Sequence, residues 1–564
     1  MINNSSTTDM KNTRSSIIYI LVFLLMGLNI SAQTNEKHNL GNEDVTIIKE
    51  YQPVLNDAFK MNILPSGDTS TAKPSELQYQ VEPLQMNSSF NVTPIKPVKI
   101  KDDVIKKLYR GFAKAGYGNY NTPLLEVDYN SLRSKLFDAG VYAKHISSTG
   151  KINGYGSPDF SASELGVHGK RYFDNNAVSA DIDFNKDIYH FYGYQSPPEM
   201  FTKDETRHMM NFLTGNFGFF STSTDKDKLA YNAGFGFTGF SDNRQSDEST
   251  LRFSAGGGKR YNDSYISGQM ELDATSIKQP LQDNGRTVFR LMPRYAFKKD
   301  QYFITAGVNF AYESGDAIDS KLHLYPHLEA KFQLLPDEVS VYGKLSGNLS
   351  TNTLAAYSKE NQFMNDFTPM LNTNHKVDFT TGVNAKLSKE LVAVASLTFS
   401  RMTDMPYYLN MQEINEPVKY TVFYDDVNML NLHFEMDYLQ ESKFGIGLRA
   451  DYYSYNSDSL DKPLYKPAFR VGLNGHYSIA DKISIKAELY YNATSYAYDY
   501  TPNSSHYLLL KNYADVNIGV EYHYTKILSA FVQLNNIGMS KYFRWYNYPS
   551  YKLNAMAGIT YSFW

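Results

Sequence analysis

Residues 551–563 read YKLNAMAGITYSF, and the alternation in this stretch decides the fold. One set of alternate positions is apolar or aromatic: Tyr551, Leu553, Ala555, Ala557, Ile559, Tyr561 and Phe563. The intervening set is mainly polar or small: Lys552, Asn554, Gly558, Thr560 and Ser562. Successive side chains of a β-strand point to opposite faces, so a period of two predicts a strand with one apolar and one polar face.

The same alternation recurs along most of the chain. It is clear in residues 376–387, 469–479, 483–491 and 508–523. One such strand fits any half-exposed antiparallel sheet. Many of them, each about ten residues long, are typical of a transmembrane barrel whose outer face meets lipid and whose inner face is polar. A mean hydropathy of −0.44 is compatible with this, because half of every barrel strand faces a wet lumen.

The connections between the predicted strands alternate in length. Short links fall at 174–176, 224–227, 262–263, 299–300, 336–338, 388–390, 441–442, 480–481 and 525–526, and longer ones at 350–373, 404–427 and 496–507. Outer-membrane barrels show this asymmetry, with short periplasmic turns and long external loops. We therefore predict an all-β, transmembrane antiparallel barrel of about 22 strands. The number becomes about 24 if 404–427 holds a hairpin of the wall.

Composition agrees with a membrane–water interface. The 564 residues include 46 Tyr and no Cys, with a formal net charge of −4. Tyrosine combines an apolar ring with a polar tip, which suits the level of the lipid headgroups. We interpret the aromatic runs at 189–194 and 452–455 as part of an external girdle; solvent-exposed loop tyrosines are the alternative. The near-neutral charge gives no support for a nucleic-acid partner.

The N-terminal part divides into two further regions. Lys11, Arg14 and the apolar run 17–28, followed by Ser31-Ala32-Gln33, predict a signal peptide over 1–32; a single membrane-anchor helix is the alternative. Residues 33–108 are polar and broken by six prolines, which suggests an extended periplasmic or luminal segment with little core of its own. The barrel is expected to occupy 109–564.

The C-terminal 40 residues resemble the last two strands of TonB-dependent receptors. Asn536-Ile537 closes the penultimate strand, Tyr542 follows, Tyr548-Pro549 leads into the last strand, and that strand runs through Ile559 and Tyr561 to Phe563. The resemblance implies uptake across the outer membrane without catalysis. It also implies partners: the bilayer and its lipopolysaccharide, the barrel-assembly machinery through the C-terminal strand, and TonB or another periplasmic protein through residues 33–108.

The chain departs from this family in two ways. Only 33–108 is available for the plug domain that precedes such barrels, and the chain ends on Trp564, one residue past the expected aromatic. Asp44-Val45-Thr46-Ile47-Ile48 looks like a TonB-box peptide, which would pair with its partner as an added strand; a short apolar patch in a tether is the alternative. We expect a related barrel that lacks the usual plug, so that either the long loops fold inward or part of 33–108 closes the lumen. We predict that part of 33–108 lies inside the barrel and narrows it; a free periplasmic arm that recruits a partner is the alternative.

No catalytic, metal or cofactor signature is recognisable. Gly256-Gly257-Gly258-Lys259 lacks the spacing of a phosphate loop and lies in a strand pattern. His323 and His327 are four residues apart on one strand, about 13 Å, which is too far for one metal ion. Barrel hydrolases place nucleophile and base on neighbouring strands, which a sequence cannot exclude, but we predict no enzyme.

The predicted lumen wall carries both signs of charge. Its candidate residues are Lys376, Asp378, Arg449, Asp451, Arg470, Lys486, Glu488, Lys511, Asp515 and Glu521. A mixed lining does not select strongly by charge, and such residues serve either a transport path or an ion-pair network that stiffens the wall. The leading functional prediction is transport or receptor-type uptake. The alternative is a non-transporting scaffold or accessory subunit of an outer-membrane assembly or secretion complex.

Overall fold

The computed structural model describes residues 108–132, 134–194, 200–223, 225, 227–411, 416–440, 443–499 and 506–563. The signal peptide, most of the 33–108 segment and Asp44–Ile48 lie outside the described residues. Within the described part, no helix is both long and apolar enough to cross a membrane.

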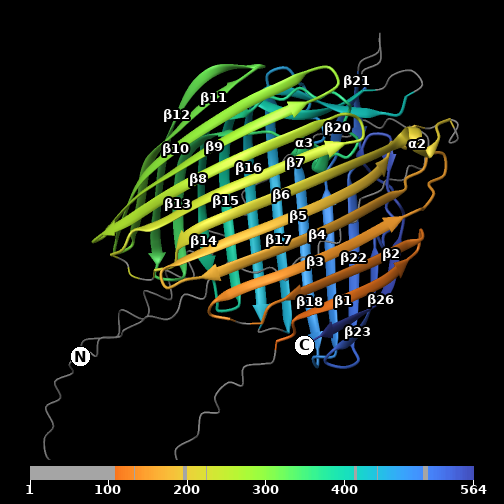
Figure 1. The fold of residues 1–564 in the computed structure, drawn as a ribbon, viewed down its shortest axis with the longest axis horizontal. Coiled ribbons are helices and arrows are strands. Elements are labelled where there is room, and N and C mark those ends of the chain that lie inside the picture. Colours follow the sequence, from red (N-terminus) through yellow and green to blue (C-terminus); the bar gives the residue numbers. More distant parts are fainter. Residues whose placement is uncertain are drawn as a thin grey trace, which may run out of the picture. The chain divides into compact units, whose positions relative to one another are not determined.

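Twenty-two antiparallel strands form one closed sheet (Figure 1). Its first half comprises β1 (Gly111–Gly118), β2 (Thr122–Asn130), β3 (Phe137–Ser148), β4 (Phe160–Tyr172), β5 (Asn176–His190), β6 (Arg207–Ser221), β7 (Ala230–Asp242), β8 (Asp247–Tyr261), β9 (Ser264–Lys278), β10 (Asp283–Lys299) and β11 (Tyr302–Gly315). Its second half comprises β12 (Ile318–Leu335), β13 (Val339–Ser350), β14 (Thr373–Lys386), β15 (Leu391–Met411), β16 (Lys419–Gln440), β17 (Phe444–Ser457), β18 (Phe469–Ile479), β19 (Ile483–Asn492), β22 (Tyr513–His523), β23 (Leu528–Asn535) and β26 (Asn554–Phe563).

The remaining elements lie in connections. They are the short helices α2 (Lys203–Thr206) and α3 (Leu354–Glu360), the hairpin of β20 (Ser495–Asp499) with β21 (His506–Leu510), and the small pair β24 (Phe543–Trp545) and β25 (Tyr548–Pro549). All of them interrupt the longer connections, at the end of the barrel opposite to Gly111 and Phe563. We call this end the loop end and the other the turn end.

The first and last strands close the barrel. β1 pairs with β26 from Gly111↔Phe563 to Gly118↔Met556, and β1 also pairs with β2. A closed sheet leaves no unpaired edge, so every strand satisfies its backbone groups on both sides. The all-β prediction and the count of 22 strands are confirmed.

The tight turns have the residues that such turns require. Asn262, Asp300 and Asp337 have positive φ values of 51°, 50° and 59°. This left-handed region strains most side chains, but Asn and Asp enter it more readily. These residues lie in links that the sequence predicts as turns.

Two predicted boundaries are wrong. Residues 404–427 are not one long loop, because β15 and β16 stay paired as far as Met411↔Lys419 after a bulge between Met402 and Met405. The hairpin lengthens existing strands, so the count remains 22. Nor does one strand run through 508–523: β21 pairs with β20 outside the barrel, and the wall strand begins only at Tyr513.

The outside of the barrel is a broad apolar surface. Large side chains that are about 40–55% exposed there include Leu125, Ile182, Phe217, Phe253, Met270, Phe379, Val532 and Ile559. On the other face of β26, Met556 is buried against Leu124, Ile146 and Phe531. Exposed apolar area of this extent suits contact with lipid rather than water.

The register continues this division across strands. Leu448, Leu473, Leu489 and Val516 pair in one row across four strands, from β17 through β18 and β19 to β22. The next row contains Gly447, Asn474, Glu488 and Asn517. Paired residues lie on the same face of a sheet, so neighbouring rows face opposite sides.

We expect Val516→Arg to destabilise the inserted barrel much more than Asn517→Arg. Arginine on the lipid face near the bilayer midplane costs about 2–4 kcal/mol, whereas the lumen face accepts charge. Refolding into lipid vesicles in a urea series, followed by the gel shift between unheated and boiled samples, measures both variants. Equal costs would contradict this assignment of faces.

Candidate functional site

The largest buried hydrophobic cluster lies at the loop end. Its core residues are Tyr189, Phe191, Tyr192, Met210, Phe212, Phe240, Ile277, Leu354, Ala355, Tyr357, Phe363, Met364, Met370, Tyr408, Val418, Tyr420, Val422, Trp545 and Tyr548. They belong to strand ends and connections spread along most of the chain. We call this cluster the loop-end closure.

The closure joins opposite sides of the barrel. In the order of the 22 wall strands, β5 is fifth and β16 is sixteenth, which is half the circumference apart. Yet the backbone N–H of Val418, just before β16, donates to the carbonyl of Gly193, just after β5, at 3.4 Å. The Tyr548 hydroxyl donates to the Val418 carbonyl. Residues from opposite walls therefore meet over the mouth of the barrel.

A single long connection supplies the centre of the closure. We call residues 351–372, between β13 and β14, the inward loop. Its neck is held by the pair Ser350↔Thr373 and by Asn352, whose side-chain amide donates to the Leu371 carbonyl at 2.8 Å. Beyond this neck the loop contains α3 and contacts β6, β8 and β16.

Local chemistry explains why α3 begins where it does. The Thr353 side chain accepts a hydrogen bond from the Ala356 N–H at 3.1 Å, as an N-cap residue should. The Glu248 carboxylate, from β8, accepts the Leu354 N–H at 2.7 Å. A negative charge at a helix N-terminus is favourable, so the wall itself fixes the start of the helix.

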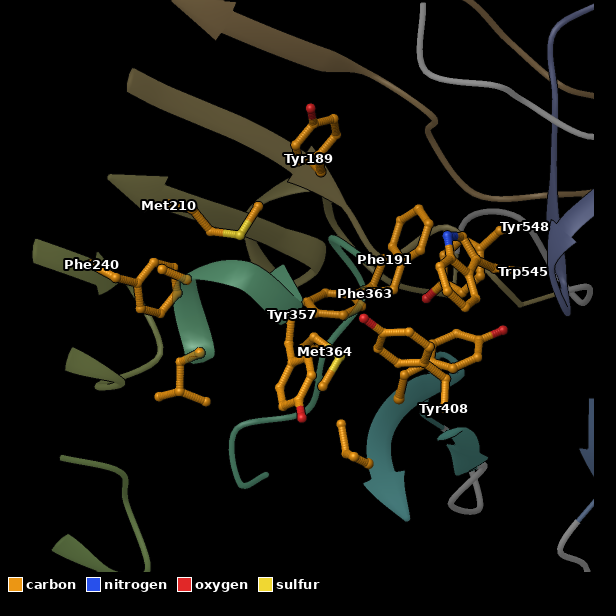
Figure 2. Packing of buried hydrophobic residues seen from close by; sticks show 14 of the residues in the cluster. Tyr189, Phe191, Met210, Phe240, Tyr357, Phe363, Met364, Tyr408, Trp545 and Tyr548 are labelled. Carbon is orange, nitrogen blue, oxygen red and sulfur yellow. The ribbon is translucent and has the colours of Figure 1, made fainter. Parts of the chain in front are cut away.

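Aromatic rings fill the space between the walls (Figure 2). The Phe363 and Tyr548 rings stack with centroids 3.5 Å apart, and Tyr192 meets Tyr548 edge-on at 5.0 Å. The Trp545 ring centroid lies 4.9 Å from that of Tyr408 and 5.4 Å from that of Tyr420. Burial raises the pKa of the Tyr548 phenol well above its usual value, so it remains protonated and able to donate.

Gly193 permits a close approach of the backbone to an aromatic ring in the closure. A Cβ at this position would lie 2.7 Å from the Tyr548 ring. Any larger residue would push this ring away from Phe363 and Tyr192. Glycine is therefore required here for contact, since its neighbours leave no room for a side chain.

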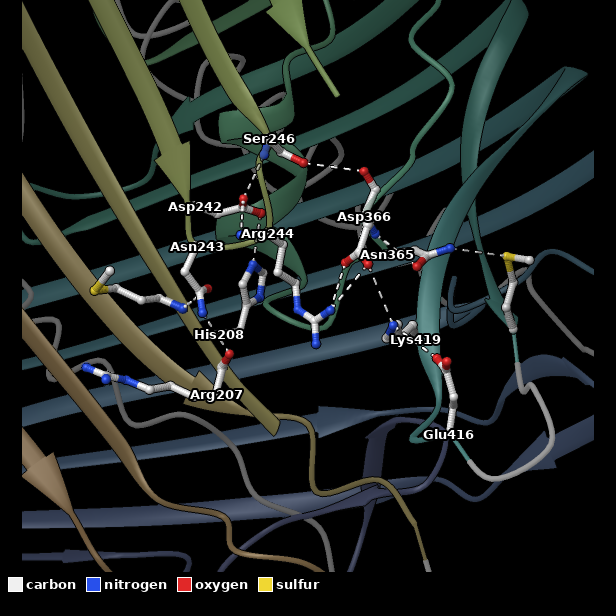
Figure 3. A network of polar contacts seen from close by, with 12 residues as sticks. Arg207, His208, Asp242, Asn243, Arg244, Ser246, Asn365, Asp366, Glu416 and Lys419 are labelled. Atoms are coloured by element: carbon white, nitrogen blue, oxygen red, sulfur yellow. Dashed lines mark hydrogen bonds and ion pairs between the residues drawn. The ribbon is translucent and has the colours of Figure 1, made fainter. Parts of the chain in front are cut away.

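A polar network joins the same elements (Figure 3). His208 on β6 is buried; its Nε2 lies 3.1 Å from Asp242 and its Nδ1 lies 2.9 Å from the Gln362 carbonyl. Both partners are hydrogen-bond acceptors, so the ring makes both contacts fully only when both nitrogens carry protons. Asp366 of the inward loop meets Arg244 and Lys419.

Below the closure, a buried ion pair secures the neck of the inward loop. Arg290 on β10 donates to Asp273 on β9 at 2.7 Å and to the Leu349 carbonyl at 3.0 and 3.1 Å. It also reaches the Thr351 hydroxyl at 2.6 Å. Arg252 on β8 contacts the other oxygen of Asp273 at 2.6 Å. The guanidinium of Arg290 thus connects β9 and β10 to the end of β13 and to the first residue of the inward loop.

Most of the predicted lumen residues make contacts with polar or aromatic neighbours. Arg449 donates to Glu435 at 3.0 Å, Asp451 pairs with His433 at 2.8 Å, and Asp378 pairs with His375 at 3.2 Å. Further contacts are Arg470 over the Tyr453 ring, Tyr490 donating to Glu488, Tyr542 donating to Asp515, and Ser529 donating to Glu521. Lys486 is exposed.

Two of the predicted lumen residues lie at irregular positions. Lys376 is exposed at a bulge between His375 and Val377. Lys511 lies in the link between β21 and β22, outside the wall strands, because the strand predicted through it is broken there. The assignment of the ten residues to a transport path remains a prediction.

The residues that carry the family resemblance have defined structural roles. Asn536 has a positive φ of 50° and donates to the Ser540 and Tyr551 carbonyls at 3.0 and 3.3 Å. Tyr542 donates to Asp515 at 2.7 Å, and the Pro549 carbonyl accepts from Tyr192. Ile559 and Tyr561 are exposed on the apolar face, and Phe563 pairs with Gly111.

The sequence indicated inward-folding loops as one way to close the barrel, but the aromatic residues that form the closure were misread. Tyr189, Phe191, Tyr192 and Tyr194 are buried, so they do not form an external girdle. Tyr551, expected on the lipid face of the last strand, precedes that strand and accepts a hydrogen bond from the Gly150 N–H at 3.1 Å. A partial signal was present, because Phe191, Tyr192, Tyr194 and Tyr551 lie outside the wall strands, where a lipid-facing role is not required. This signal does not identify their actual neighbours.

Comparisons with known proteins find similarity in structure only. No protein-family model matches the chain, and no curated protein matches its sequence. The chain is similar in structure to the ferric-catecholate import receptor Fiu from K12 E. coli, with a TM-score of 0.62, 9% identity, and coverage of 80% of this chain and 82% of that chain.

Two further solved structures are similar to a comparable degree. The FrpB iron transporter from Neisseria meningitidis gives a TM-score of 0.62 at 10% identity, covering 81% of this chain and 82% of that chain. The siderophore receptor PirA from Acinetobacter baumannii gives 0.60 at 11% identity, covering 80% of each chain. At such low identity the likeness establishes a shared fold: this chain has the large barrel architecture of these receptors.

Proposed function

We propose that this protein is a receptor of the bacterial outer membrane that takes up a ligand across it. The observation that carries this proposal is the loop-end closure on a 22-strand barrel. A general diffusion pore needs an open mouth, whereas a gated receptor needs a large barrel and a mouth that its own loops can close. The turn end then faces the periplasm, as the short turns predict.

The functions of the structurally similar proteins support a class of ligand. They import ferric catecholate, transport iron or bind siderophores. We extend this class to the present chain and propose an iron–chelate ligand that enters from the loop end. The mixed charges predicted in the lumen would then line the path below the closure.

Periplasmic partners belong to the same proposal. Energy for release would come from TonB or a comparable protein that pairs with residues 33–108, with Asp44–Ile48 as the candidate strand. The strand that ends at Phe563 would present the chain to the barrel-assembly machinery, and the apolar exterior would contact lipid and lipopolysaccharide.

The proposal predicts a growth defect under iron limitation when the gene is deleted. The intact gene should restore growth. One or a few supplied siderophores should support growth only in strains that carry the gene. The protein should fractionate with outer membranes. The scaffold alternative would instead be favoured by two results. The deletion strain would use every tested siderophore normally, and it would lack a protein complex that co-purifies with this protein in the unchanged strain.

A further inference from the structure

A carboxylate lies between two cations in the polar network of Figure 3. Arg244 Nη1 lies 3.1 and 3.3 Å from the two carboxylate oxygens of Asp366 in the inward loop, and the second of these oxygens is also 3.8 Å from Lys419 Nζ. The two cationic side chains are only 20% and 14% exposed, but the carboxylate is 36% exposed. Solvent therefore reaches the carboxylate more readily than the cations that hold it.

The two cations are built into different parts of the wall. Arg244 lies in the turn between β7 and β8, whereas Lys419 is the first residue of β16. Both lie over the Phe191 ring, at 4.8 and 6.0 Å from its centroid. Such cation–π contacts hold the two charges near one another even when no anion is present.

The site has hydrogen-bonding capacity that Asp366 does not use. Nε of Arg244 is buried without a hydrogen-bond partner, although a guanidinium can bind a carboxylate through two parallel N–H groups. Lys419 also contacts Glu416, at 3.1 Å. Asp366 is thus an imperfect occupant, held through one guanidinium nitrogen and one distant ammonium group.

We propose that Arg244 and Lys419 form a binding site for a carboxylate group of the ligand, and that Asp366 occupies this site when the ligand is absent. A ligand carboxylate that engages Arg244 more completely would displace Asp366. The inference rests on the proposed receptor function and deepens it, because it names an anionic, carboxylate-bearing ligand and the place where it first binds.

Displacement of Asp366 would loosen the inward loop locally. The Asp366 carbonyl accepts only a long hydrogen bond from Ser246, at 3.4 Å, whereas the neighbouring Asn365 N–H donates to the Tyr420 carbonyl at 2.6 Å. Loss of the ion pairs would therefore free the Asp366 end of the loop from the β7–β8 turn, while the loop stays attached to β16 and, through Leu354, to Glu248 of β8. Binding of the ligand would therefore weaken the closure directly.

The test measures binding of propane-1,2,3-tricarboxylate to the purified full-length protein in detergent. Trp545, inside the closure, reports on the change by its fluorescence once Trp564→Phe removes the only other tryptophan. Asp366→Asn should bind the tricarboxylate about tenfold more tightly than the unchanged protein, since the internal competitor is lost and a charge-assisted hydrogen bond is worth about that factor. Adding Arg244→Gln to Asp366→Asn should abolish the gain.

Controls separate this site from general attraction of anions. Asp461→Asn removes the same charge from an exposed loop-end position and should leave the affinity unchanged. The trimethyl ester of the probe should not bind. Equal affinity of the Asp366→Asn and unchanged proteins, or a gain that survives Arg244→Gln, would overturn the inference. Because no transport is measured, a failure of uptake in cells would contradict the proposed function without affecting this result.

Discussion

Replacing residues 353–370 by two glycines should open the barrel to the outside. The neck of the inward loop is already closed by Ser350↔Thr373 and by the hydrogen bond from Asn352 to Leu371, so a short link can join β13 to β14 without distorting either strand. The variant loses α3, Phe363 and Met364 from the closure, which removes its centre. Wall residues on opposite sides would then lack the rings that bridge them.

The expected result is a large rise in single-channel conductance in planar bilayers and in sensitivity to bulky antibiotics in cells. A deletion within residues 33–108 provides a second variant whose conductance can be compared, because the sequence predicts that part of this segment narrows the lumen. Deleting 35–105 alone should have a small effect while the loop-end closure is intact, and the double variant should conduct most. High conductance from the 35–105 deletion alone would show that the closure does not seal the mouth.

Arg290→Met should destabilise the barrel by about 3–5 kcal/mol, the usual cost of removing one partner from a buried ion pair. Both side chains of the pair are nearly inaccessible, at 9% and 1% exposure. The substitution also leaves the Leu349 carbonyl without the two hydrogen bonds that it accepts from Arg290. Methionine fills a similar volume, so the loss is electrostatic rather than steric.

Arg252→Met is the matched control, because Arg252 contacts the same Asp273 but is 57% exposed. Exposed ion pairs contribute only about 0–1 kcal/mol. Urea denaturation of vesicle-inserted protein should therefore give a small shift for Arg252→Met and a large one for Arg290→Met. Similar shifts for the two variants would contradict the assignment of Arg290 as the residue that secures the neck.

The wall of the barrel could be predicted from the sequence because its determinants are local. In β26, Ile559 and Tyr561 alternate with polar neighbours, and lipid on one side with water on the other imposes that period at every strand. Tight turns add Asn262, Asp300 and Asp337 at positions that tolerate positive φ. The prediction failed at 404–427, where the short strand-like pattern from Tyr420 to Tyr424 does not by itself distinguish a hairpin that lengthens two wall strands from a loop.

The residues that form the closure could not be predicted because their contacts are not local. Phe191 and Tyr192 are aromatic residues at a strand end, and a lipid girdle would show the same composition. Their real neighbours are Phe363 and Tyr548, far away in the sequence. Only the closed sheet brings these segments together, so an aromatic run beyond the alternating pattern has no unique interpretation. The pairing of Asp366 with Arg244 is hidden for the same reason.

The half-circumference relation between β5 and β16 has a consequence for biogenesis. The contact of Val418 with Gly193 requires eleven strand-to-strand steps in each direction around the wall. Because bringing distant segments together costs loop-closure entropy, we expect these contacts to form late, after most of the wall strands have paired. A barrel with a missing or extra hairpin would bring different residues face to face. We therefore expect the aromatic contacts of the closure to form only in a barrel whose wall has the correct number of strands.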